Sequence, residues 1–165
     1  MSPTDNSTSN GNANGHGDGT PLFVSRFDNK VDEKRRIQIP SAWRRGQTGV
    51  RYLLLPAPKR AWRPACVVAM PPQRFSALVQ ELRQMRFSDD RADSLRRLLA
   101  TRACEVETDS AGRICLPDDV AKAVDIKERV VLAGMIDWFE LWSPERFAQV
   151  EAGDDERSGE AFSLI

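Results

Sequence analysis

Residues 31–40 read VDEKRRIQIP, and residues 108–117 read TDSAGRICLP. Both stretches contain an Asp, an Arg four positions later, two apolar residues separated by one other residue, and a closing Pro. Apolar residues at every second position are typical of a short strand with one buried face, and the Pro fits the first turn of a helix. The repeat therefore predicts two copies of one strand-and-turn unit, 77 positions apart.

A second pair of similar stretches marks the end of each copy. Residues 71–75 read PPQRF and residues 143–147 read SPERF, at an offset of 72 positions. The first copy therefore carries five extra residues between its two anchors. We place them in residues 46–64, where clusters of Pro and Gly predict a longer loop.

Each copy is predicted to run strand, turn, strand, short helix, hairpin and helix. The short helices are expected after Pro40 and Pro117, and β-branched and aromatic residues predict the hairpin strands. The strands are expected at 50–55 and 65–70 in the first copy and at 129–134 and 138–142 in the second, with closing helices at 72–85 and 144–151. Neither copy has enough strands to close a core alone, so we expect the copies to interlock about a pseudo-twofold axis.

The chain divides into five expected segments. Fourteen of the first twenty residues are Gly, Asn, Ser or Thr, a composition that predicts disorder. A helix between the copies is expected to begin with Ser88 as its N-cap and to carry solvated charges. The segments are a disordered N-terminal extension (1–21), a first half (22–86), a connecting helix (87–102), a second half (103–150) and an acidic flexible tail (151–165).

Composition excludes several function classes. The 165 residues contain no apolar run of the roughly 18 to 20 residues that a membrane span needs, and no signal peptide is visible, so we expect a cytosolic protein. The only histidine, His16, lies in the extension, which argues against His-based catalytic triads and metal sites. We expect no enzyme activity, no cofactor, no metal and no small-molecule substrate. The three cysteines, Cys66, Cys104 and Cys115, are interpreted as small buried hydrophobic residues.

The net charge of zero conceals an asymmetry. Residues 22–63 contain eleven Lys or Arg against three acids, whereas residues 64–165 contain thirteen against nineteen. Such polarity fits a basic face for a polyanion, and an ordinary solvated face would also explain it.

Three stretches, DEKRRIQIP, LRRLLATRACEVETDSAGRICLP and ERVVLAGMIDWFELWSPERF, resemble the MraZ family of bacterial transcriptional regulators, from about Leu22 to Val150. The resemblance implies an α+β fold of two tandem AbrB-like swapped-hairpin halves, which form a pseudo-twofold double-split β-barrel with peripheral helices. It also implies a ring-shaped homo-oligomer that binds repeated boxes of double-stranded promoter DNA. The regulated genes would be a division and cell-wall cluster, usually repressed, which places the protein in the cytoplasm at the nucleoid. In that family the arginine of the first D-x-x-G-R motif binds DNA, and here it is Arg36.

The chain departs from the family pattern in the first half. Arg35 stands where Gly is usual, although the second copy keeps Gly112. If that position has a positive φ, an arginine costs roughly 1 kcal/mol or more, so either the turn is reshaped or the extra guanidinium compensates by contacting phosphate. The usual Met-Phe-x-Gly start appears as Leu22-Phe23-Val24-Ser25, behind a twenty-one-residue extension.

The two motifs differ in charge, which predicts different roles. Six cations lie within sixteen residues of the first copy, namely Lys30, Lys34, Arg35, Arg36, Arg44 and Arg45. The aligned residues 107–123 contain only Arg113 and Lys122, together with several acids. We therefore expect the first loop to contact DNA. Asp109 and Arg113 are interpreted as a structural or assembly-related pair, and Asp32 as a residue that orients Arg36.

Chemistry assigns a role to each candidate. An arginine can bind the O6 and N7 atoms of guanine together, whereas a lysine is a point charge for phosphate. We assign Arg36 to base readout, Arg35 to base or phosphate, and Lys34 and Lys30 to phosphate, with Arg44 or Arg45 facing the groove. The alternative is an oligomeric structural or protein-interaction module of the same fold, with weakened or lost base readout.

The tryptophans also have two interpretations. They could form stacking platforms for bases, or they could pack in the core or at an interface, which is the commoner use of buried aromatic rings. We favour packing for all four, Trp43, Trp62, Trp138 and Trp142.

Overall fold

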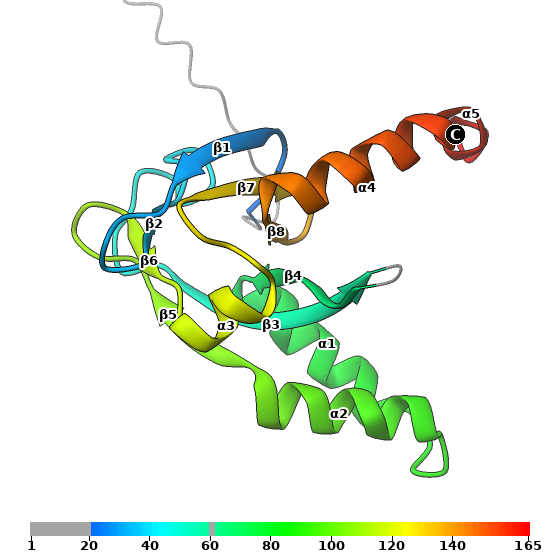
Figure 1. Ribbon diagram of the computed structural model, residues 1–165. Coiled ribbons are helices and arrows are strands. Elements are labelled where there is room, and N and C mark those ends of the chain that lie inside the picture. Colours follow the sequence, from blue (N-terminus) through cyan, green and yellow to red (C-terminus); the bar gives the residue numbers. More distant parts are fainter. Residues whose placement is uncertain (1–20, 60–61) are drawn as a thin grey trace, which may run out of the picture.

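The computed structural model of the chain describes residues 21–59 and 62–165 (Figure 1). The predicted disorder of the N-terminal extension and the predicted packing of the Trp62 side chain lie outside this description. The elements are β1 (Arg26–Lys30), β2 (Arg36–Gln38), β3 (Arg51–Lys59), β4 (Trp62–Met70), α1 (Pro72–Gln84), α2 (Asp90–Arg102), β5 (Cys104–Glu107), β6 (Arg113–Cys115), α3 (Asp118–Ala123), β7 (Arg129–Gly134), β8 (Phe139–Trp142), α4 (Pro144–Glu156) and α5 (Ser158–Phe162).

The strands of the two halves pair with one another. A six-stranded sheet has the order β1-β7-β8-β4-β3-β5, and a second sheet consists of β2 and β6. Strand β1 of the first half pairs with β7 of the second, β5 of the second pairs with β3 of the first, and all of these pairs are antiparallel. Each half thus completes the sheet of the other, as the shortage of strands predicted. The fold class is α+β, and the described strands form no closed barrel.

The main core lies beneath the two repeated motifs. The apolar pairs Ile37/Ile39 and Ile114/Leu116 are fully buried, as the alternation predicted. Ile37 lies opposite Ile114 in the β2–β6 pair, so the repeated strands pack against each other at their centres. The core therefore depends equally on both copies of the motif.

Aromatic rings fill the rest of this core. Trp43 is buried, its ring lies edge-on to Phe23 and Phe27 at 5.6 and 5.1 Å between centroids, and its Nε1–H donates to the Val24 carbonyl. The predicted packing of Trp43 and Trp142 is confirmed, because both side chains are almost fully buried. Trp138 is only partly buried, and the guanidinium of Arg74 lies 5.7 Å from the centre of its ring.

Two predictions in the first half were wrong. The residues after Pro40 form turns instead of a helix, because Arg45 and Gly46 adopt positive φ values of 51° and 67° that end helical geometry. The extra residues of 46–64 lengthen a hairpin instead of forming a loop. Strands β3 and β4 have nine residues each, whereas β7 has six and β8 has four.

The connecting helix differs from the prediction at its start and on its surface. Asp89, not Ser88, is the N-cap, since its carboxylate accepts the backbone N–H groups of Arg91 and Ala92. The charges of α2 are not all solvated, because Arg96 Nη2 donates to the carbonyls of Leu82 and Met85 at 2.6 and 3.1 Å. Arg96 therefore caps the last turn of α1 and holds the two helices together.

The C-terminal residues and the cysteines complete the description. In residues 151–165, where the sequence predicts an acidic flexible tail, α4 continues to Glu156 and α5 follows. Cys66 is buried as predicted, but Cys104 is only half-buried and Cys115 is exposed. Within the described ranges, no helix is both long enough and apolar enough to cross a membrane.

Candidate nucleic-acid interface

The two motif loops, residues 32–36 and 109–113, share one set of hydrogen bonds. The Asp32 carboxylate accepts the backbone N–H of Lys34 at 2.9 Å, that of Arg36 at 2.8 Å, and Arg36 Nε–H at 2.6 Å. In the second loop, the Asp109 carboxylate accepts the backbone N–H groups of Ala111 and Arg113 and the Nε–H of Arg113, at 2.9, 2.9 and 3.0 Å. The Asp–Arg bridge predicted for the second loop is thus present in both.

These bonds favour the ionised form of both aspartates. The backbone N–H of Arg36 holds the pKa of Asp32 below its ordinary value, and the side chain of Arg36 contributes further. Arg113 lowers the pKa of Asp109 in the same way, again chiefly through its backbone N–H. Each carboxylate therefore remains a negative anchor at neutral pH and fixes the direction of its arginine.

The apex of each loop has the same left-handed backbone. Arg35 has a φ of 59° and Gly112 a φ of 77°. The first loop has thus not been reshaped to accommodate its arginine, which carries a strain of roughly 1 kcal/mol that glycine avoids. Each apex carbonyl accepts a hydrogen bond from the other half, Arg35 from Leu116 N–H at 2.9 Å and Gly112 from Ile39 N–H at 3.0 Å. The two loops are therefore tied together by backbone hydrogen bonds between the halves.

The apices differ in what covers them. The Arg44 side chain lies over Gly112, so close that a Cβ on that glycine would be 2.3 Å from Arg44 Cζ. Arg44 is held there by the carbonyls of Ile39 and Gln47, at 3.1 and 2.8 Å. In the second half the position equivalent to Arg44 is Ala121, a small buried residue. At the second apex, Gly112 lies beneath Arg44. At the first apex, the loop residue is Arg35 and the position equivalent to Arg44 is Ala121.

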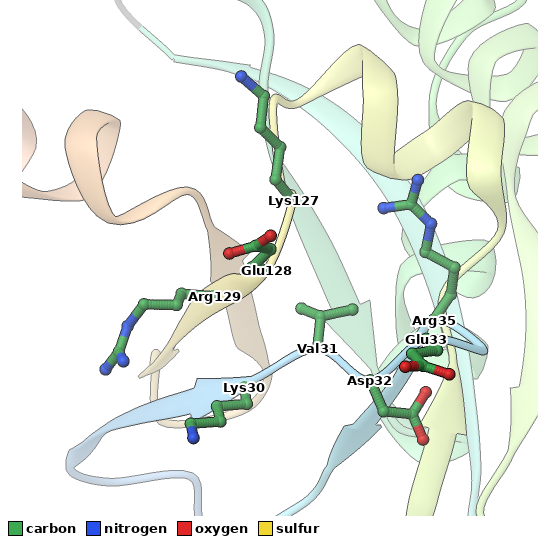
Figure 2. Close-up of a pocket in the computed structure, with 8 residues that line it drawn as sticks. All are labelled: Lys30, Val31, Asp32, Glu33, Arg35, Lys127, Glu128 and Arg129. Carbon is green, nitrogen blue, oxygen red and sulfur yellow. The ribbon is translucent and has the colours of Figure 1, made fainter.

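The Arg35 side chain reaches across to the second half. Its Nη2 lies 2.7 Å from Asp118 Oδ1 at the start of α3, in an ion pair between the halves. Figure 2 shows the guanidinium of Arg35 turned toward α3, away from Asp32 and Glu33. Arg35 is therefore oriented but remains partly exposed.

An open groove of about 770 Å³ runs beside the first loop (Figure 2). It is formed by β1, the first loop and the segment that leads into β7. Its lining contains four cations and three acids, namely Lys30, Arg35, Lys127, Arg129, Asp32, Glu33 and Glu128, together with Val31. The described residues thus place cations from both halves around one concave surface.

The structure brings most, though not all, of the predicted site residues together. Lys30 and Arg35 line the groove, Lys34 is exposed on the loop beside it, and Arg36 is anchored by Asp32. Arg44 is not part of this cluster, because it lies against the second loop.

Sequence reasoning missed two cations of the groove, Lys127 and Arg129. Pairing of β1 with β7 places Lys30 opposite Arg129. The expected interlocking of the halves pointed toward such a contact. The register of the pairing could not be read from the chain.

Comparisons with known proteins agree on one family. The family model described as "MraZ protein, putative antitoxin-like" matches residues 99–162. A protein of Symbiobacterium thermophilum named "Transcriptional regulator MraZ" is 30% identical over 142 residues, which cover 86% of this chain and 96% of the relative. Proteins of the same name from Leuconostoc mesenteroides and Thermomicrobium roseum are 29% and 28% identical, over 81% and 77% of this chain and 91% and 85% of their own lengths.

Proposed function

Because the chain belongs to the MraZ family, we propose that it is a transcriptional regulator that binds double-stranded promoter DNA through its first motif loop. One observation supports this assignment. The two motif loops share their backbone and hydrogen bonds but differ in the side chains on their surfaces. Exposed or partly exposed cations surround the first loop, whereas the apex of the second is buried beneath Arg44. Two loops with a purely structural role would not need this difference in exposed charge.

Arg36 is the proposed base-reading residue. Asp32 fixes its direction, as an orienting carboxylate does for a guanidinium that takes guanine O6 and N7 together. Such a contact is worth about 1 to 3 kcal/mol of discrimination against other bases. Lys34 and Lys30 serve phosphates, and Lys127 and Arg129 extend the same surface from the second half. Arg44 contributes indirectly by holding the second loop.

The finer architecture is also part of the proposal. Cross-pairing of β1 with β7, β3 with β5 and β2 with β6 supports two tandem swapped-hairpin halves that together form a split barrel. A single loop offers few contacts, so we propose a ring of copies that binds repeated promoter boxes as a repressor of a division and cell-wall gene cluster, in the cytoplasm at the nucleoid. Linked binding of adjacent boxes raises affinity by about 10² to 10⁴.

The binding experiment uses fluorescence anisotropy of the full chain with two labelled duplexes. One duplex is the region upstream of its own gene, and the other is a shuffled sequence of the same composition. Arg36→Ala should remove the preference for the upstream duplex. Lys34→Ala should weaken binding to both duplexes alike and should reduce the slope of log affinity against log salt concentration, the salt slope, by about 0.9. Binding that does not respond to salt, or a preference that survives Arg36→Ala, would contradict the proposal.

A second candidate function is an oligomeric interaction module without base readout. The ion pair that engages Arg35 with Asp118 favours it, because it occupies one cation of the loop. Light scattering after gel filtration separates assembly from binding. A ring that binds neither duplex would support the module, and a monomer at working concentration would remove the argument from avidity.

A further inference from the structure

One carboxylate outside the first loop contacts the cation at its apex. Asp118 Oδ1 lies 2.7 Å from Arg35 Nη2, and Asp118 Oδ2 lies 2.6 Å from Lys122 Nζ. The hydrogen bond from Lys122, with further help from Arg35, lowers the pKa of Asp118. The carboxylate is therefore charged at neutral pH and is shared between two cations.

The pair is specific to this arrangement of the two halves. The position of the first half that corresponds to Asp118 is Ser41, which has no charge. The position that corresponds to Arg35 is Gly112, which has no side chain. An acid on α3 and an arginine in the loop thus occur together where the other half has neither.

The pair can be broken by a competing anion. The side chains of Arg35 and Asp118 are 33% and 55% exposed, so water and salt screen their attraction, and exposed pairs of this kind add little stability. A DNA phosphate offers Arg35 a comparable partner. If Arg35 leaves, Lys122 still holds the Asp118 carboxylate.

We propose that Asp118 limits the affinity of the first loop for DNA, because its carboxylate competes with DNA phosphates for the guanidinium of Arg35. This inference rests on the proposed function. In loose, non-specific contact the Asp118 carboxylate keeps Arg35, so this arginine makes no contact with phosphate. When Arg36 reads its base, a phosphate is held close to Arg35, and the guanidinium moves from the carboxylate to the phosphate at the cost of the broken ion pair. Asp118 therefore weakens binding to both sequences, by no more than the strength of that pair.

The chain offers a matched control for this idea. Asp118→Asn removes the partner of Arg35, while Asp119→Asn removes the same charge from the next residue of α3, which is also exposed. Both variants are compared with the wild type by fluorescence anisotropy, on the upstream and shuffled duplexes and over a salt series. Asp118→Asn should tighten binding to the shuffled duplex by about three- to fivefold, the size expected for an exposed ion pair. For the shuffled duplex, the salt slope of this variant should steepen by about 0.9, because one more phosphate is neutralised. The upstream duplex should gain at least as much, because there the wild type breaks the ion pair to make the same contact.

A double-mutant cycle shows whether Asp118 acts through Arg35. In an Arg35→Ala background, Asp118→Asn should have no more effect than Asp119→Asn. Thermal unfolding of each variant checks that the fold is intact. Asp118→Ser, which installs the residue of the first half, serves as a second variant if the asparagine disturbs α3.

The outcomes separate the inference from the function on which it rests. If the wild type binds DNA and Asp118→Asn has the same effect on affinity as Asp119→Asn, the inference is overturned while the proposed function stands. An effect that persists without Arg35 overturns it too, since the acid would then act only as a general charge. A wild type that binds neither duplex overturns the proposed function, and the inference with it.

Discussion

The loop at 32–36 and the loop at 109–113 have the same backbone and opposite surfaces. In each, an aspartate accepts two backbone N–H groups and one arginine Nε–H. At the first apex, Arg35 extends to Asp118 and Lys34 is exposed, whereas at the second, Gly112 is buried under Arg44. The comparison separates the residues that make the turn from those that give one turn a surface for a polyanion. Changes at the shared positions should therefore alter stability in both halves alike, whereas changes at the two differing apices should have unequal effects.

The largest effect on stability is expected at the covered apex. Gly112→Ala adds left-handed strain and pushes Arg44 away from the carbonyls of Ile39 and Gln47. The loss should be about 2 kcal/mol in the free energy of unfolding, measured by urea denaturation. The matched change is Arg35→Ala, which should cost less than about 1 kcal/mol because the strain is already present and only an exposed ion pair is lost. Equal losses would show that the two apices are covered alike.

The next effect concerns the shared aspartates and depends on pH. Their pKa values are lowered in the fold, so their stabilisation is fully present above the unfolded pKa of about 3.9 and is lost as pH falls through the lower folded values. Asp32→Asn and Asp109→Asn should lower the melting temperature by similar amounts at pH 7. In both variants the melting temperature should also fall less than in the wild type as the pH is lowered, as followed by circular dichroism. A large effect of one variant and none of the other would break the equivalence of the loops.

The smallest effect on stability is expected for Arg35→Gly. Removing the side chain relieves strain of about 1 kcal/mol and gives up one exposed ion pair, so the two changes nearly cancel. The melting temperature should change little, while the affinity for DNA should fall because a phosphate contact is lost. A marked loss of stability would mean that the pair with Asp118 holds the halves together.

Much of the fold could be predicted because the chain repeats it. The buried pairs of β2 and β6 follow from alternation, and the expectation of interlocking halves follows from the small number of strands in each. The helix after Pro40 could not be rejected, since the positive φ of Arg45 and Gly46 depends on tertiary contacts. Similarly, the extension of β3 and β4 depends on pairing, which overrides the turn signals of their Pro residues.

The candidate site was predictable to a smaller extent. The cluster of Lys30, Lys34 and Arg35 is visible in the chain, but the direction of each side chain is not. Arg44 lies near Arg36 in sequence and yet covers the other loop. The partnership of Arg35 with Asp118 joins residues of different halves, and only the packing of α3 against the first loop reveals it.

The most direct measurement compares Arg36→Ala with Arg113→Ala, the same change at equivalent positions. Each variant is titrated onto the upstream and shuffled duplexes at one salt concentration, and its unfolding is recorded alongside. The two should lose similar stability, since each removes the same bridge to an aspartate. Only Arg36→Ala should lose the preference for the upstream duplex. An equal loss of preference in both variants, or a loss confined to Arg113→Ala, would contradict the assignment of DNA binding to the first loop.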